Sequence, residues 1–89
     1  MKIIDGFKLR TISGEMVVCG EGVDQINFGA LIVLNESASF LWQSVEGKEF
    51  DQARLAELLM SEYQIDEALA KSDAEAIARR WIEAKIVAE

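Results

Sequence analysis

The chain has 89 residues, with 16 acidic side chains, 9 basic side chains and no histidine, and its formal charge is −7. That length indicates a single domain over residues 1–89, and a hydrophobic fraction of 51% is too high for a disordered chain. The absence of histidine excludes imidazole catalysis and histidine metal sites. The acidic charge argues against binding a polyanion. These features favour a small binding domain over an enzyme.

The first third of the chain has the pattern of β-strands. Apolar and basic side chains alternate over residues 7–11, which predicts a half-buried strand. Ser13-Gly14 predicts a tight turn, and residues 16–19 then form the return strand. A third strand is expected over residues 30–34. Its unbroken apolar run suggests that both of its faces are covered.

The rest of the chain has the pattern of three helices, each with a capping residue at its start. Asn35, Asp51 and Asp66 are the expected N-caps, and Gly47 ends the first helix. A start of the third helix at Ser72 is an alternative, but the longer helix is favoured. We therefore predict an α+β, winged-helix-like fold, in which a three-stranded antiparallel sheet is followed by three helices. The apolar positions at helical spacing are Ala38, Leu41, Trp42 and Val45, then Leu55, Leu58, Leu59 and Tyr63, then Ala70, Ala74, Ile77, Ala78 and Trp81.

The sequence carries no sign of export or of membrane insertion. Cys19 is the single cysteine, so an intramolecular disulfide is excluded, which suits a reducing cytoplasm. In an apolar strand Cys19 is most simply a small buried side chain. The first six residues do not resemble a signal peptide, and the longest apolar run, residues 30–34, is far shorter than the ~20 residues of a membrane span. We expect a cytoplasmic protein.

An ordered set of short matches resembles the PqqD-like family. The segment Leu34-Asn35-Glu36-Ser37-Ala38 is followed one helical turn later by Leu41-Trp42. Further matches are Glu46-Gly47, the apolar residues from Leu55 to Leu59, Glu62-Tyr63 and the acidic Asp73. Together these positions fall within residues 7–87, which is nearly the whole chain.

The resemblance implies a recognition element for ribosomally synthesised precursor peptides. Such a domain is not catalytic and needs no cofactor or metal. It captures the leader segment of the precursor and presents it to a modifying enzyme, often a radical-SAM maturase. In that family the leader adds as a strand to the third strand and lies against the third helix. The peptide-binding residues implied here are Ala30, Leu31, Ile32, Val33, Leu34, Ile77, Arg80, Trp81 and Ala84.

Two positions depart from the family pattern. Members that make pyrroloquinoline quinone usually carry Tyr-Pro-Glu-Gly before the third strand, whereas this chain has Gln25-Ile26-Asn27-Phe28-Gly29 and no proline. That departure speaks against a role in making this cofactor. Lys85 stands where a glycine commonly ends the last helix, so we expect the Ile86-Val87 tail to leave at a different angle.

The implied site residues also have a simpler interpretation. Ile77 and Trp81 lie on the apolar stripe of the third helix, and such a stripe usually belongs to the core. Arg79 follows Glu75 by four residues and can pair with it on an exposed helix face. The residue four positions before Arg80 is Ala76, which cannot pair with it. Arg80 is therefore the better candidate to meet an acidic group of a leader peptide.

Two other functions remain open from the sequence. A winged-helix nucleic-acid binder would use residues 66–84 as its recognition helix, but five acidic and three basic side chains give that span a net charge of −2. This charge opposes phosphate contacts, and we expect no nucleic-acid partner and no membrane partner. The other possibility is a structural module in which the same strand edge pairs with a second copy as a homodimer.

Overall fold

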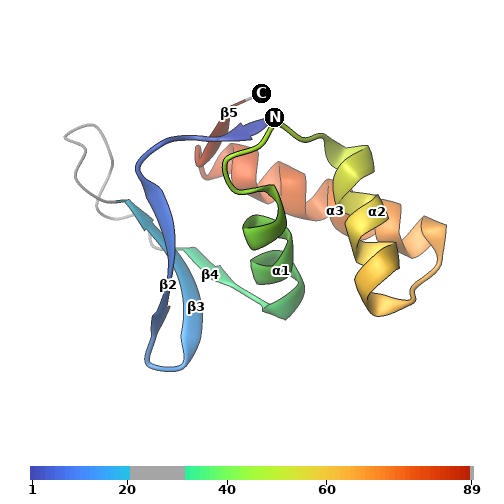
Figure 1. Ribbon diagram of the computed structural model, residues 1–89, viewed down its shortest axis with the longest axis horizontal. Coiled ribbons are helices and arrows are strands. Elements are labelled where there is room, and N and C mark those ends of the chain that lie inside the picture. The colour runs from blue at the N-terminus through green and yellow to red at the C-terminus, as the bar shows by residue number, and fades with distance from the viewer. Residues whose placement is uncertain (21–31, 89) are drawn as a thin grey trace.

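The computed structural model describes residues 1–20 and 32–88 and shows the predicted α+β fold (Figure 1). A three-stranded antiparallel sheet has the order β2-β3-β4, and the three helices lie on one side of it. The elements of this fold are β2 (Phe7–Ile12), β3 (Glu15–Gly20), β4 (Ile32–Leu34), α1 (Glu36–Val45), α2 (Gln52–Tyr63) and α3 (Glu67–Glu83). Residues 21–31, which include the first two positions of the predicted third strand, lie outside the described residues.

The predicted turn between β2 and β3 is confirmed as a two-residue β-hairpin. Ile12 pairs with Glu15, so only Ser13 and Gly14 form the loop. Their φ angles are 52° and 82°. Positive φ at both central residues defines the type I′ turn, whose twist matches that of the flanking strands. The Ser13-Gly14 turn therefore fixes the register in which β2 pairs with β3.

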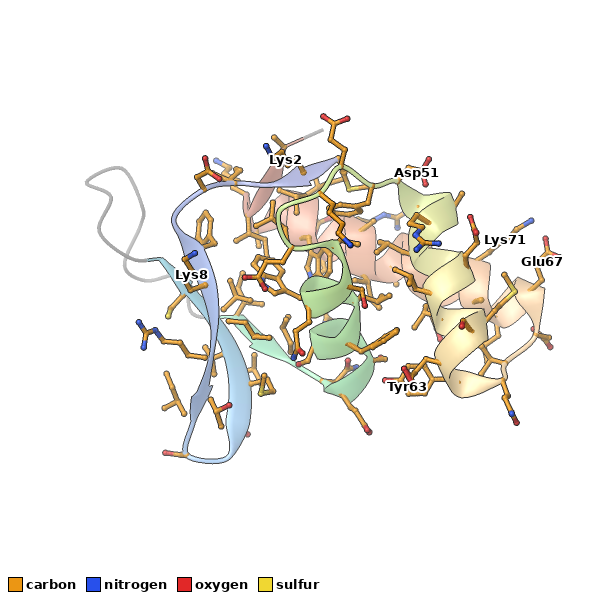
Figure 2. The ribbon with its side chains drawn as sticks, in the orientation of Figure 1. Lys2, Lys8, Asp51, Tyr63, Glu67 and Lys71 are labelled. Carbon is orange, nitrogen blue, oxygen red and sulfur yellow. The ribbon has the colours of Figure 1, made fainter. Side chains whose placement is uncertain are left out.

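The three predicted N-caps are confirmed. The side chains of Asn35, Asp51 and Asp66 each accept a hydrogen bond from the backbone N–H three residues later, at 2.9, 2.8 and 2.8 Å (Figure 2 labels Asp51). Each bond satisfies an amide that the first helical turn leaves without a partner. Because Asp66 caps α3, that helix begins at Glu67 and not at Ser72.

The end of α3 is a Schellman motif centred on a non-glycine residue. Lys85 N–H donates to the Ile82 carbonyl at 3.0 Å, and Ile86 N–H donates to the Trp81 carbonyl at 3.2 Å. This pattern needs a left-handed residue at the first position beyond the cap, which is usually glycine. Lys85 has a φ of 61° and fills that position despite its side chain. The chain therefore keeps the left-handed turn, although Lys85 stands where the family commonly has glycine.

The turn at Lys85 leads into a second, two-stranded sheet that the sequence analysis did not predict. β1 (Lys2–Ile3) pairs antiparallel with β5 (Val87–Ala88). The terminal ammonium of Met1 also donates to the Phe50 carbonyl at 2.7 Å. The pairing of β1 with β5 ties the first residues to the end of the chain, and the Met1 bond ties them to the segment between α1 and α2. The two termini lie close together in Figure 1.

One aromatic cluster occupies the centre of the core. The rings of Trp42 and Trp81 meet edge to face with centroids 5.4 Å apart, and Phe50 meets Trp81 at 6.2 Å. Both tryptophans have no exposed surface. Pairs with this geometry contribute about 0.5–1.5 kcal/mol beyond the burial of their area. Trp81 therefore fixes α3 against α1.

The expectation that both faces of the third strand are covered is wrong. Leu34 is buried against the helices, whereas Val33 is 54% exposed. Side chains alternate between the two faces of a strand. Since the described helices lie on one side of the sheet, they cover Leu34 and leave Val33 open on the other face.

Candidate functional site

β4 is an edge strand of the described sheet. It pairs with β3 on one side, through Met16 with Leu34, Val17 with Val33 and Val18 with Ile32. On its other side it pairs with none of the described strands, because the order of the sheet is β2-β3-β4. An edge strand presents backbone N–H and C=O groups that can accept another strand.

The hairpin turn determines which backbone groups of β3 face β4. In a two-residue turn the carbonyl of the first flanking residue bonds the N–H of the second, so Ile12 and Glu15 form a hydrogen-bonded pair. Such pairs alternate along an antiparallel ladder. The backbone groups of Glu15 and Val17 thus face β2, and those of Met16 and Val18 face β4.

The same alternation continues into β4. Ile32 and Leu34 stand opposite Val18 and Met16, so the backbone groups of both face inward to β3. We infer that the N–H and C=O of Val33 face the open edge. Val33 is therefore the residue of described β4 that offers a free donor and acceptor for a further strand.

A small pocket lies between the start of α1 and the exposed side of α3. Its volume is about 220 Å³, which suits the side chain of one residue. Two residues implied by the family resemblance, Ile77 and Arg80, contribute to it. The lining that the sequence analysis missed consists of Asn35, Ser37, Asp73 and Ala76. Spacing held a signal for part of it, since residues 73, 76, 77 and 80 form one face of a helix.

The two adjacent arginines of α3 differ in their surroundings, as predicted. Arg79 donates to Glu75 Oε1 at 2.7 Å, so the Arg79 guanidinium is engaged in an exposed i,i+4 ion pair on the helix surface. Arg80 makes no salt bridge with any described residue, and its side chain lines the pocket. Asp73 contributes a carboxylate to the same pocket, so the pocket presents one charge of each sign.

Two implied site residues are not part of the pocket surface. Trp81 is fully buried in the aromatic cluster, and Ala84 is the half-buried C-cap of α3. Trp81 therefore lies in the core and holds in place the helix that carries Ile77 and Arg80. Ala30 and Leu31 lie outside the described residues.

The remaining charges of α3 lie on its exposed surface. The Lys71 ammonium, 2.7 Å from Glu67 Oε1, lowers the pKa of the Glu67 carboxyl, mainly through that hydrogen bond and then through its charge (Figure 2).

In the part of the chain that the structure describes, no group of three or more Cys, Asp or Glu side chains is placed to hold a metal ion. No described helix is long and apolar enough to cross a membrane.

These features define a small α+β domain in which an open strand edge lies beside a helix that lines a pocket. The chain belongs to the PqqD family: the family model described as coenzyme PQQ synthesis protein D matches residues 14–87. This confirms the predicted membership. No curated protein matches the chain.

One solved structure is similar over the full length of both chains. It is TbiB1 in complex with the TbiA(beta) leader peptide, with a TM-score of 0.73, 22% sequence identity and 100% coverage of each chain. The likeness supports the predicted arrangement of a three-stranded sheet and three helices.

Proposed function

We propose that this protein is a non-catalytic recognition domain that binds the leader of a ribosomally made precursor peptide and presents it to a modifying enzyme, such as a radical-SAM maturase. The observation that carries the proposal is the open edge of β4 beside the pocket on α3. Membership of the PqqD family supports it. The similar protein TbiB1, which binds a leader peptide, supports it further.

The mode of binding that we propose is β-augmentation. An extended leader pairs its backbone with the N–H and C=O of Val33, and the family resemblance extends the contact to Ala30 and Leu31. Because side chains of a strand alternate, one side chain of the leader in every two points toward α3. Backbone pairing supplies affinity, and the pocket supplies selection among sequences.

The pocket suggests which leader side chain is selected. Ile77 offers an apolar wall, and the Arg80 guanidinium, which has no described salt-bridge partner, offers charge-assisted hydrogen bonds. An acidic side chain beside an apolar one fits Arg80 and Ile77 when its carboxylate lies on the Arg80 side of the pocket, away from Asp73. Trp81 and Ala84 contribute indirectly, by fixing the end of α3 that carries these two residues.

The test is fluorescence anisotropy with a labelled leader peptide, taken from the short precursor that the proposal predicts to be encoded beside this protein. Val33→Pro removes the N–H at the open edge, where proline is tolerated, and leaves the bonds of β4 to β3 intact. We expect circular dichroism to be unchanged and binding to weaken about tenfold or more, through the lost bond and the clash of the ring. Ile32→Pro is the matched control, because its N–H faces β3 and its loss disrupts the sheet.

Two results would contradict the proposal at different levels. Absence of saturable binding by the unmodified protein would refute leader recognition itself. Equal binding by Val33→Pro and the unmodified protein would refute augmentation at this edge. Sedimentation adds a third arm, because a tight dimer that dissociates on Val33→Pro would show that the edge pairs with a second copy of the chain.

A further inference from the structure

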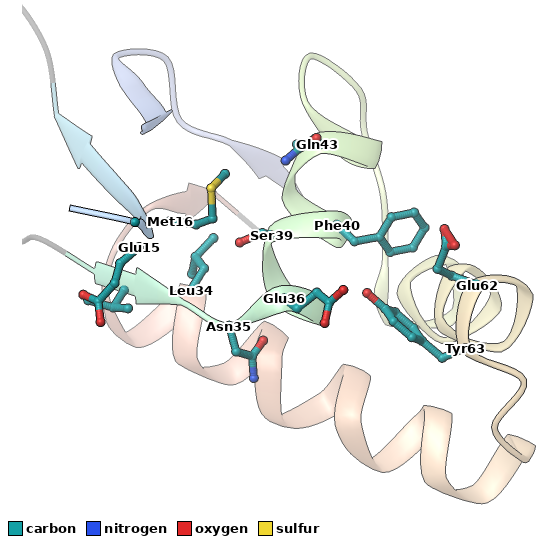
Figure 3. Close-up of a pocket in the computed structure, with 12 residues that line it drawn as sticks. Glu15, Met16, Leu34, Asn35, Glu36, Ser39, Phe40, Gln43, Glu62 and Tyr63 are labelled. Carbon is teal, nitrogen blue, oxygen red and sulfur yellow. The ribbon is translucent and has the colours of Figure 1, made fainter. Parts of the chain in front are cut away.

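A second and larger pocket lies on the other side of the β4–α1 junction (Figure 3). Its volume is about 700 Å³. It forms where the start of β3, the start of α1 and the end of α2 meet, and it shares only Asn35 with the pocket on α3. Val33 and Leu34 of β4 line it as well, so it adjoins that strand, whereas none of its described lining residues belongs to α3.

The charge around this pocket has one sign. Glu15 from β3, Glu36 from α1 and Glu62 from α2 all line it, and no lysine or arginine is among its described lining residues. Three separate elements thus contribute carboxylates to the lining, and those of Glu36 and Glu62 lie on either side of Tyr63, away from Glu15 (Figure 3). A cationic group placed between Glu36 and Glu62 gains two attractive interactions and meets no lysine or arginine of the described lining.

The uncharged part of the lining suits the stem of a long basic side chain. Phe40 and Tyr63 meet edge to face with ring centroids 5.9 Å apart, and Met16 and Leu34 add aliphatic surface. Aromatic faces attract guanidinium and ammonium groups, and lysine and arginine bury their methylene stems against apolar surface.

Ser39 provides an observation that is independent of the acidic groups. The residue is 5% exposed, and its Oγ has no hydrogen-bond partner in the described part of the chain. In Figure 3 this oxygen points from α1 toward the wall formed by Met16 and Leu34. A buried hydroxyl without a partner is unfavourable. Met16 is flexible, so a small movement of its side chain lets a ligand N–H reach the hydroxyl.

The ionisation of Tyr63 reports the same electrostatic field. Burial raises the pKa of the Tyr63 hydroxyl, and the carboxylates of Glu36 and Glu62 raise it further. In Figure 3 the hydroxyl points toward Glu36. The carboxylates of Glu36 and Glu62 therefore both act on one point between α1 and α2, where an incoming cation would sit.

We propose that this pocket binds an arginine or lysine side chain presented by a partner protein. Its lining shares only Asn35 with the pocket on α3, so a leader side chain held in the pocket on α3 leaves this pocket open to a second protein. The inference stands on the pocket itself and does not depend on leader binding.

The probe for the test is N-acetyl-arginine amide, with N-acetyl-citrulline amide as its neutral counterpart, titrated into isotope-labelled protein and followed by NMR. We expect saturable shifts at the amides of Ser39, Phe40 and Tyr63 with the arginine probe, and no saturation with the citrulline probe. Glu62→Gln should weaken binding about fivefold, the effect of one nearby charge in a solvated site. Glu83→Gln is the matched control, since it removes one carboxylate outside the lining and should leave binding unchanged.

A second readout uses the only tyrosine of the chain. A bound cation stabilises the phenolate, so the arginine probe should lower the pKa of Tyr63, measured by tyrosinate absorbance. Equal responses to both probes, or equal weakening by Glu62→Gln and Glu83→Gln, would overturn the proposal. Competition between the probe and a leader peptide would overturn the assignment to a second protein. The Ile77→Ala protein, whose change lies in the pocket on α3 and outside this lining, should bind the probe normally, which separates this result from the test of leader binding.

Discussion

Lys85 is strained by its backbone conformation, and replacing it with glycine should stabilise the fold. Lys85 has a φ of 61° at the end of α3, where the Schellman motif requires a left-handed residue. A side chain in that conformation costs roughly 1–2 kcal/mol, and glycine avoids this cost. Glycine also loses more freedom on folding, which removes about 0.5–1 kcal/mol of the gain. Lys85→Gly should therefore raise the free energy of unfolding by about 0.5–1 kcal/mol.

Urea unfolding followed by tryptophan fluorescence measures this change, because Trp42 and Trp81 are both fully buried. Lys85→Ala is the matched control: it removes the same charge and keeps the Cβ atom that causes the strain. The glycine variant should be more stable than the alanine variant, and its melting temperature should rise by a few degrees, at about 4–8 °C per kcal/mol for a domain of this size. If the alanine variant is equally or more stable, the strain argument at Lys85 is refuted.

Three further predictions concern the core, the pocket on α3 and the ionisation of Tyr63. Trp81→Ala should destabilise the protein by about 3–5 kcal/mol, since it empties the centre of the aromatic cluster, so stability and leader binding should fall together. Ile77→Ala, at a half-buried position, should weaken leader binding with a much smaller change in the urea midpoint. If Trp81→Ala loses binding while the protein stays fully folded, Trp81 is a direct peptide contact and its assignment to the core alone is refuted. Because the folded chain keeps the Tyr63 proton to higher pH than the unfolded chain, the contribution of Tyr63 to the free energy of unfolding should be constant up to a pH of about 10 and fall as the pH rises through the raised pKa of Tyr63. Tyr63→Phe should remove that fall, and an identical alkaline profile in this variant would show that another group is responsible.

The features predicted correctly from the sequence depend on residues close together in the chain. Asn35, Asp51 and Asp66 cap their helices through amides three residues away, and Ser13-Gly14 turns the chain within a single hairpin. Their geometry is decided by local sterics and hydrogen bonds, so a short window of sequence contains the information. The family pattern also spread over nearly the whole chain, which allowed the membership to be recognised.

The features that were missed depend on contacts between distant segments. β1 and β5 have two residues each and stand at opposite ends of the chain, so neither has a pattern that predicts their pairing. The apolar residues of β4 were expected to be covered on both faces, yet the helices cover only the face of Leu34. Trp81 was implied as a peptide contact by the family resemblance, whereas its place on the apolar stripe favoured the core. Its burial supports the core position, which helical spacing alone does not separate from a groove wall.

The sequence by itself determined the helices, their caps, the hairpin turn and the family, because each depends on local chemistry or on an ordered set of residues. Only the tertiary structure decided that Val33, and not Ile32, faces the open edge, because that depends on the register of β4 against β3 across a long connection. Only the tertiary structure brought Glu15, Glu36 and Glu62 to one pocket. Three carboxylates far apart in an acidic chain become a site only when three elements pack together.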